Sequence, residues 1–288
     1  MLWFILAILT ALAMSSEGAW LKKYFSHLDP YEMGMASIIY SLPLFAIAMI
    51  LIPHPPLPHQ FWAAFLGTFV LNGIAYFLYV RAIQISPLSL TIPYLAFTPA
   101  FMIFTGRILL DEEPSPLGIA GILVSLAGGY LLNLDVTKWS PLEPLRAALR
   151  ERGSRHMLVV AVIYSVSSVL DKKAILHSSP IFFGIFFYIV FAPTLFILLL
   201  LGQKISWDFW LRNPGKGIVA GLLVFAHSVF HVWALSLTKA AYMISVKRLS
   251  ILFSVIYGWI IFGESNMAAR LGGAVLMMLG AVIIALAG

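Results

Sequence analysis

The sequence predicts an all-α integral membrane protein whose ten transmembrane helices form two inverted five-helix repeats. Three observations support this fold class. Hydrophobic residues make up 61% of the 288 residues and charged residues only 10%, whereas a soluble domain needs a larger polar surface. Apolar stretches long enough to cross a bilayer recur along the chain. The rare residues of the first half also recur at matching positions in the second half.

The individual spans follow from the requirement for about 20 apolar residues per helix. The first stretch has no basic residue after Met1 and no clear small-residue cleavage site before Glu17, so we expect a retained span and not a signal peptide. Most connections are very short, which predicts antiparallel neighbours. We place the spans at 2–21, 32–52, 61–82, 88–110, 116–134, 157–175, 181–202, 216–237, 240–262 and 268–287.

One long connection, residues 135–156, joins the two halves. It combines several basic residues with leucines at helical spacing, which favours a short amphipathic helix on the membrane surface. A plain solvated linker is equally compatible with these residues. The expected organisation is a first repeat over 1–134, a basic surface linker over 135–156 and a second repeat over 157–288.

The internal repeat is the most informative feature of the chain. A shift of 150 residues superimposes Ser15 on Ser165, Lys22 on Lys172, Lys23 on Lys173, His27 on His177, Pro30 on Pro180, Gly34 on Gly184 and Pro43 on Pro193. A shift of 152 superimposes Ala82 on Ala234, Phe101 on Phe253, Glu112 on Glu264, Gly121 on Gly273 and Gly128 on Gly280. Each half holds an odd number of spans, so the second half must lie upside down relative to the first. Inverted repeats of this kind build a site near the bilayer midplane.

Three segments carry a recognisable pattern. They are Glu17–Lys23 at the end of the first span, Leu109–Gly121 after the fourth span, and Phe262–Gly273 at the corresponding place in the second half. These segments resemble the EamA-type transporters of the drug/metabolite transporter superfamily, and the resemblance covers essentially the whole chain. It implies ten helices, a central cavity lined mainly by spans 1, 3, 4, 6, 8 and 9, and export or exchange of small metabolites.

Lys247 and Arg248 are the most informative charges because they lie seven and eight residues into the ninth span. A cation at the centre of a membrane helix costs about 2.5–3.5 kcal/mol. An anion between them would relieve this cost, and a guanidinium matches phosphate or carboxylate geometry. Plastid phosphate translocators of the same superfamily are similar in carrying an adjacent Lys-Arg pair in the ninth span. The alternative is snorkelling to the nearer interface, with pairing to Glu17.

Two further spans carry titratable candidates for the substrate site. Glu17 could neutralise the basic pair when the site is empty, couple transport to protons, or lie at the interface. His227 and His231 share one face of the eighth span, at i and i+4. No third ligand is evident, so we expect them to line a polar cavity or move a proton, and we expect no metal or cofactor.

The remaining candidates are polar residues that would also be compatible with structural roles. Lys22 and Lys172 each belong to a recurring lysine pair, in which one member could face the cavity and the other anchor the helix at the interface. Asn72, Tyr94 and Tyr242 would supply hydrogen-bonding groups in an apolar wall. A tyrosine alone is more often a packing or interface residue.

Prolines and small residues suggest where helices bend and where they approach closely. Prolines inside spans act as hinges or as kinks that packing holds rigid, and small-residue faces indicate close packing within the chain or between protomers. The prolines are Pro43, Pro93, Pro99 and Pro193, and the small residues are Gly121, Ser125, Gly129, Gly273, Gly280 and Ala281.

Membrane orientation is where two arguments conflict. The family resemblance implies that both termini lie in the cytoplasm. The basic residues, however, concentrate in the connections on the opposite side from the termini, and basic loops prefer the cytoplasm. On charge alone we predict that both termini lie outside the cell membrane.

We therefore expect a secondary carrier that moves a small organic anion, phosphorylated anions included, by alternating access. The alternatives are an exporter of amino acids or drug-like metabolites, a lipid-phosphate flippase, a non-transporting receptor and, ranked low, an integral membrane lipid-modifying enzyme. The chain has no cysteine, which excludes disulfides and thiolate chemistry. The net charge of +6 lies mainly in loops and indicates topology, not nucleic-acid binding. The expected partners are a small molecule and the lipid bilayer, with the protein a monomer or homodimer.

Overall fold

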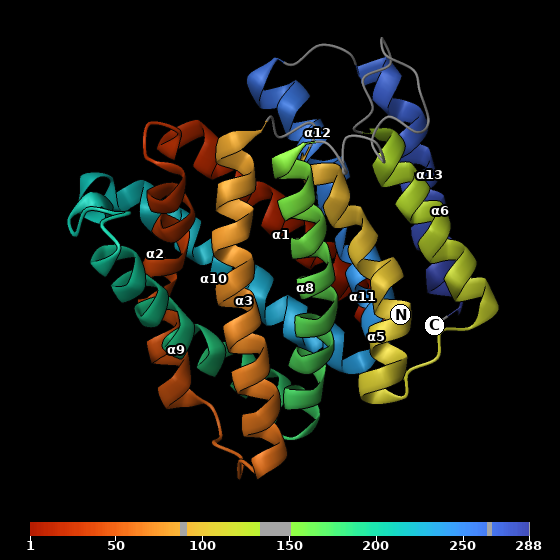
Figure 1. Ribbon diagram of the computed structural model, residues 1–288, viewed down its shortest axis with the longest axis horizontal. Helices are drawn as coiled ribbons and strands as arrows, with labels where there is room; N and C mark the ends of the chain where they lie inside the picture. The colour runs from red at the N-terminus through yellow and green to blue at the C-terminus, as the bar shows by residue number, and fades with distance from the viewer. Residues whose placement is uncertain (87–90, 133–150, 264–266, 288) are drawn as a thin grey trace.

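The computed structural model describes residues 1–86, 91–132, 151–263 and 267–287, and the regular secondary structure among these residues is helical, with no β-strand (Figure 1). The first repeat contains α1 (Leu2–Phe25), α2 (Pro30–Leu51), α3 (His59–Ile85), the 3-10 helix η1 (Ile92–Phe97), α5 (Thr98–Leu110) and α6 (Pro116–Leu132). The second repeat contains α8 (Arg152–Leu176), α9 (Pro180–Leu201), the 3-10 helix η3 (Phe209–Arg212), α10 (Pro214–Leu237), α11 (Ala240–Lys247), α12 (Ser250–Phe262) and α13 (Met267–Ala287).

Helix length and composition agree with a membrane location. Six segments are long and apolar enough to cross a bilayer, namely α1, α2, α3, α9, α10 and the continuous stretch Ala240–Phe262. Shorter apolar helices cover Tyr94–Leu110, Pro116–Leu131 and Gly272–Ala287. Of the expected spans, α8 is the most polar, because it carries basic residues in its first turn and Asp171 in its second half.

The helix boundaries repeat in the two halves. A shift of 150 places α2 on α9 with both ends matched. A shift of 152 places α5 on α12, again with both ends matched. The next residue is left-handed in both halves, Asp111 with φ 53° and Gly263 with φ 65°. Two inverted five-helix repeats are therefore present in the backbone as well as in the sequence.

The fourth span of each repeat is broken. Pro93 and Pro99 predicted a bend or hinge in the span at 88–110, whereas the span at 240–262 was expected to be continuous. The expected start at residue 88 lies outside the described residues. In the first repeat η1 meets α5 near Pro99, which has no amide hydrogen to donate. In the second repeat the turn tightens without a proline, because the amide of Leu249 bonds the carbonyl of Val246 at 3.0 Å. The break places the basic pair at the C-terminal end of α11, where the helix dipole favours cations.

The two repeats interlock, and each first helix packs on the third helix of the other repeat. Thus α1 lies against α10 and α3 lies against α8, while α6 and α13 run together along one side (Figure 1). The small residues predicted for close packing serve the α6–α13 contact inside the chain. A Cβ added at Gly280 would lie 2.5 Å from the backbone nitrogen of Ser125, a separation that only glycine permits.

One pair of contacts breaks the symmetry between the repeats. Helices α2 and α10 touch through their backbones, since a Cβ at Gly221 would lie 2.5 Å from the carbonyl carbon of Tyr40. The symmetry-related pair, α9 and α3, is spaced by aromatic rings instead. The ring centroids of Phe65 and Phe186 are 5.1 Å apart, and those of Phe69 and Phe191 are 5.7 Å apart. The α2–α10 side is therefore packed more closely than the α3–α9 side.

Helix α8 begins at Arg152, five residues before the expected start of the sixth span at 157. The carboxylate of Glu151 caps α8 by accepting bonds from the amides of Ser154 at 2.7 Å and Gly153 at 3.2 Å. Burial alone would raise the pKa of Glu151, but these bonds and nearby Arg155 lower it below its usual value. Of the segment 135–156, in which a surface helix was expected, residues 135–150 lie outside the described residues, and 151–156 form the cap and first turn of α8.

Candidate functional site

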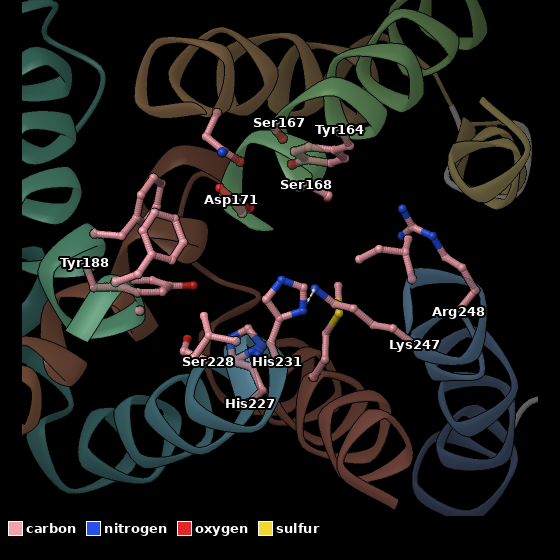
Figure 2. A pocket seen from close by; sticks show the side chains of 17 residues that line it. Tyr164, Ser167, Ser168, Asp171, Tyr188, His227, Ser228, His231, Lys247 and Arg248 are labelled. Carbon is pink, nitrogen blue, oxygen red and sulfur yellow. Dashed lines mark hydrogen bonds between the residues drawn. The ribbon is translucent and has the colours of Figure 1, made fainter. Parts of the chain in front are cut away.

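A cavity of about 240 Å³ lies between the two repeats (Figure 2). Its walls come from α1, α3, α8, α9, α10 and α11. The family resemblance implied that spans 1, 3, 4, 6, 8 and 9 would line a central cavity. Here α9, the seventh span, contributes instead of the fourth, which supplies no lining residue among the described parts of the chain.

Lys247 and Arg248 both reach this cavity from the end of α11. The amine of Lys247 lies 3.4 Å from Nδ1 of His231 (Figure 2). Arg248 is 9% exposed, donates from Nη2 to the hydroxyl of Thr98 at 2.9 Å, and leaves its Nε without a hydrogen-bond partner. Within the described residues neither cation has a carboxylate within 4.0 Å. In the described part of the chain, these two enclosed positive charges therefore form no ion pair with a carboxylate.

Glu17 lies next to the cavity wall and does not pair with the basic residues in this structure. Its Oε1 accepts a hydrogen bond from the hydroxyl of Ser37 at 2.7 Å, and its Oε2 lies 3.6 Å from Nε2 of His227. The side chain is 16% exposed. Glu17 therefore links α1 to α2 and α10, and the positive charges of Lys247 and Arg248 remain available.

His227 and His231 line the cavity together from one face of α10, as the sequence spacing predicts. His227 contacts Glu17 and His231 contacts Lys247. No group of three or more metal-ligating side chains occurs in the part of the chain that the structure describes. The histidines thus connect a carboxylate and a cation along one wall.

A further carboxylate, Asp171, lines the cavity and was not among the sequence candidates. The Nδ2 of Asn72 donates to the hydroxyl of Thr68 at 2.9 Å, and that hydroxyl donates to Oδ1 of Asp171. Asn72 was predicted from sequence and does line the cavity. Asp171 is adjacent to the recurring lysine pair near the expected end of a span, so it resembled an interfacial residue. One sequence signal could have identified Asp171 as a candidate. The corresponding residue in the first repeat is Leu21, so the charge occurs in one repeat and not in the other.

Lys172 belongs to a structural link outside the cavity. Its amine pairs with Glu112 and donates to the carbonyl of Thr238 at 2.6 Å. The other oxygen of Glu112 accepts from the amide of Ala240 at 2.8 Å. This link ties the ends of α5 and α8 to the start of α11, which gives the recurring lysine a packing role.

Lys22, Tyr94 and Tyr242 do not line the cavity either. Lys22 is exposed near the end of α1, with its amine 4.3 Å from the centre of the Phe262 ring. Tyr94 is buried and stacks on Phe97 with ring centroids 6.3 Å apart. Tyr242 is buried, and its hydroxyl accepts from the amide of Ser115 at 2.8 Å. Tyr242 thus fastens the broken fourth span of the second repeat to the residue that precedes α6, whereas the stack of Tyr94 on Phe97 lies within η1.

Comparison with known proteins decides the family. The model of the EamA-like transporter family matches residues 1–134 and again residues 153–286. The chain belongs to the EamA-like transporter family. Its two matches cover the two repeats seen in the structure, so this is a multi-pass membrane protein of a transporter family.

A curated relative and a solved structure agree with this assignment. The chain is 21% identical over 234 residues to a WAT1-related protein of Arabidopsis thaliana. The match covers 74% of this chain and 66% of that protein, so the chain spans just under two thirds of its relative. A protein of known crystal structure superimposes with a TM-score of 0.72 at 15% identity, covering 99% of this chain and 95% of the other. This last likeness establishes the fold.

Proposed function

We propose that this EamA-like protein is a secondary transporter of a small organic anion, and that Lys247 and Arg248 bind the anionic group. One observation carries the proposal, namely two enclosed cations that line one cavity with no carboxylate within 4.0 Å among the described residues. Such charges are costly to bury unless something pairs with them. A carboxylate or phosphate would supply the missing counter-charge.

The hydrogen-bonding capacity of the pair also favours an anion. The unpartnered Nε–H of Arg248 is a donor, and so is the ammonium group of Lys247. Thr98 holds one end of the guanidinium, which fixes its direction without neutralising it. The two cations are thus oriented before a ligand arrives, which reduces the ordering cost of binding.

Alternating access is the transport mechanism that the repeat architecture supports. The fourth spans break at equivalent places and the basic pair lies at one break, as in carriers whose halves rock about a central site. The close α2–α10 contact and the ring-spaced α3–α9 contact differ in packing. If the α3–α9 contact became close and the α2–α10 contact became wide, the cavity would open to the other side of the membrane.

The test removes the charges of the basic pair and keeps polar side chains in their place. We expect 3-phenylpropanoate or glycerol 3-phosphate to stabilise the unmodified protein against heat and to be taken up into proteoliposomes, and we expect Lys247→Gln with Arg248→Gln to abolish both effects. The matched control is Lys204→Gln with Arg212→Gln, because both residues are exposed and lie outside the cavity. Undiminished uptake by the cavity variant, with the control also active, would refute the anion assignment.

A further inference from the structure

We infer that the transported anion also carries an ammonium group, and that Asp171 binds this group across the cavity from Lys247 and Arg248. This inference rests on the proposed function, since it assumes that the basic pair holds the anionic end. Figure 2 shows Asp171 on the α8 wall, with Lys247 and Arg248 coming from a different helix end. The substrate class is therefore a small amphoteric metabolite.

The hydrogen bonds around Asp171 favour its ionised form. The Nδ2 of Asn72 bonds both the carbonyl and the hydroxyl oxygen of Thr68, each at 2.9 Å. The carbonyl can only accept, so this nitrogen is a donor and the Thr68 oxygen accepts from it. The hydroxyl hydrogen of Thr68 can then point to the carbonyl of Ser167, 3.4 Å away, or to Oδ1 of Asp171, and the much shorter contact to Oδ1 of Asp171 takes it. A carboxylate held by a donor in this way is prepared to bind a cation with its other oxygen.

The scaffold keeps the opposite charges of the cavity apart. Lys247 is held by His231, Arg248 by Thr98 and Asp171 by Thr68. Asp171 forms no ion pair with either cation within 4.0 Å in the described residues, although all three line one cavity. Separated charges in a low-dielectric site are unfavourable. A ligand with one anionic and one cationic end satisfies both sides, whereas a simple anion leaves Asp171 unpaired.

The size and walls of the cavity restrict the substrate further. A volume of about 240 Å³ lies below the usual range of roughly 300–1,000 Å³ for drug-sized ligands. Phe183, Phe187 and Tyr188 of α9 add aromatic surface to the cavity wall. A short molecule with two charged ends and an apolar body matches this lining.

The test uses two series of three compounds, with one skeleton shared within each series, and the full-length protein in detergent. The first series is leucine, 4-methylpentanoate, which lacks the ammonium group, and 3-methylbutylamine, which lacks the carboxylate. The second is phosphoethanolamine, ethyl phosphate and ethylamine. In at least one series we expect the amphoteric compound to bind at least about tenfold more tightly than both counterparts, because a hydrogen bond to a charged group is worth about that much.

Substitution of the carboxylate isolates its contribution. Asp171→Asn should reduce the preference for the amphoteric compound over its anion to below about threefold, since the amide cannot pair with an ammonium group. The matched control is Asp111→Asn, because Asp111 is exposed and its left-handed backbone tolerates asparagine. Thermal melting of both variants without ligand verifies that they fold.

The outcomes separate this inference from the function on which it rests. Equal binding of the anion and the amphoteric compound in both series, measured on the unmodified protein, overturns the inference, and so does failure of both amphoteric compounds to bind. An unchanged preference in a folded Asp171→Asn variant overturns it as well. Binding that survives Lys247→Gln with Arg248→Gln overturns the anion assignment instead.

Discussion

Alanine at Gly221 should force apart the closed contact between α2 and α10. The added Cβ would lie 2.5 Å from the backbone carbonyl carbon of Tyr40, and no side-chain rotation relieves a clash with backbone. Overpacking of this kind costs about 1–3 kcal/mol. If the contact belongs to one of two transport states, this cost reduces the population of that state relative to the other by roughly 5- to 150-fold.

A single-cysteine assay measures the shift directly because the chain has no native cysteine. Ser228 lines the cavity from α10 and is almost fully buried, so Ser228→Cys reports access to the cavity. Because Gly221→Ala should open the contact between α2 and α10, we expect it to accelerate the reaction of the introduced cysteine with a water-soluble maleimide. We also expect it to slow transport.

The control is Gly73→Ala, where an added Cβ meets nothing within 4 Å. Alanine there should leave labelling unchanged and stabilise the helix by about 0.5–1 kcal/mol. Equal labelling rates and equal transport for Gly221→Ala and Gly73→Ala would refute the reasoning that this contact defines a transport state.

Two further predictions concern the structural link and the orientation. Glu112→Gln removes the partner of Lys172, whose side chain is 10% exposed, and loss of one partner of a buried pair costs about 3–5 kcal/mol. Glu112→Gln should therefore lower the melting temperature by several degrees. The control Glu113→Gln, at a side chain that is 66% exposed, should leave the melting temperature unchanged. Equal melting temperatures of the two variants would contradict the role of the link. The charge distribution predicts that reporter enzymes fused to either terminus are active outside the cytoplasm, and reporters at both ends functioning inside would reverse this orientation.

Local sequence signals were sufficient for the fold class. The number of spans, their approximate limits and the repeat all follow from apolar runs and from rare residues in register. These features depend on the lipid surroundings of each helix, which act on every residue of a span in the same way. The recurring Lys172 and Glu112 were visible in the sequence, but their direct pairing was not, because it joins residues 60 positions apart.

The candidate site was partly predictable for a similar reason. Lys247, Arg248, His227, His231 and Asn72 stood out as polar groups inside apolar runs, and each lines the cavity. Pro93 and Pro99 marked the first fourth span as a place where the helix bends. The break in the second was not predicted, because the apolar pattern is continuous across it and no proline lies at the turn.

The sequence by itself determined that this protein crosses the membrane as two inverted repeats and that charge is placed inside them. A cation within an apolar run must be satisfied by something, whatever the fold. Only the tertiary structure decided which charges meet. It placed Glu17 beside His227 and Lys172 beside Glu112, and it brought Asp171 to the same cavity as Lys247 and Arg248 without pairing them. Packing of distant helices sets those separations, and no local pattern encodes them.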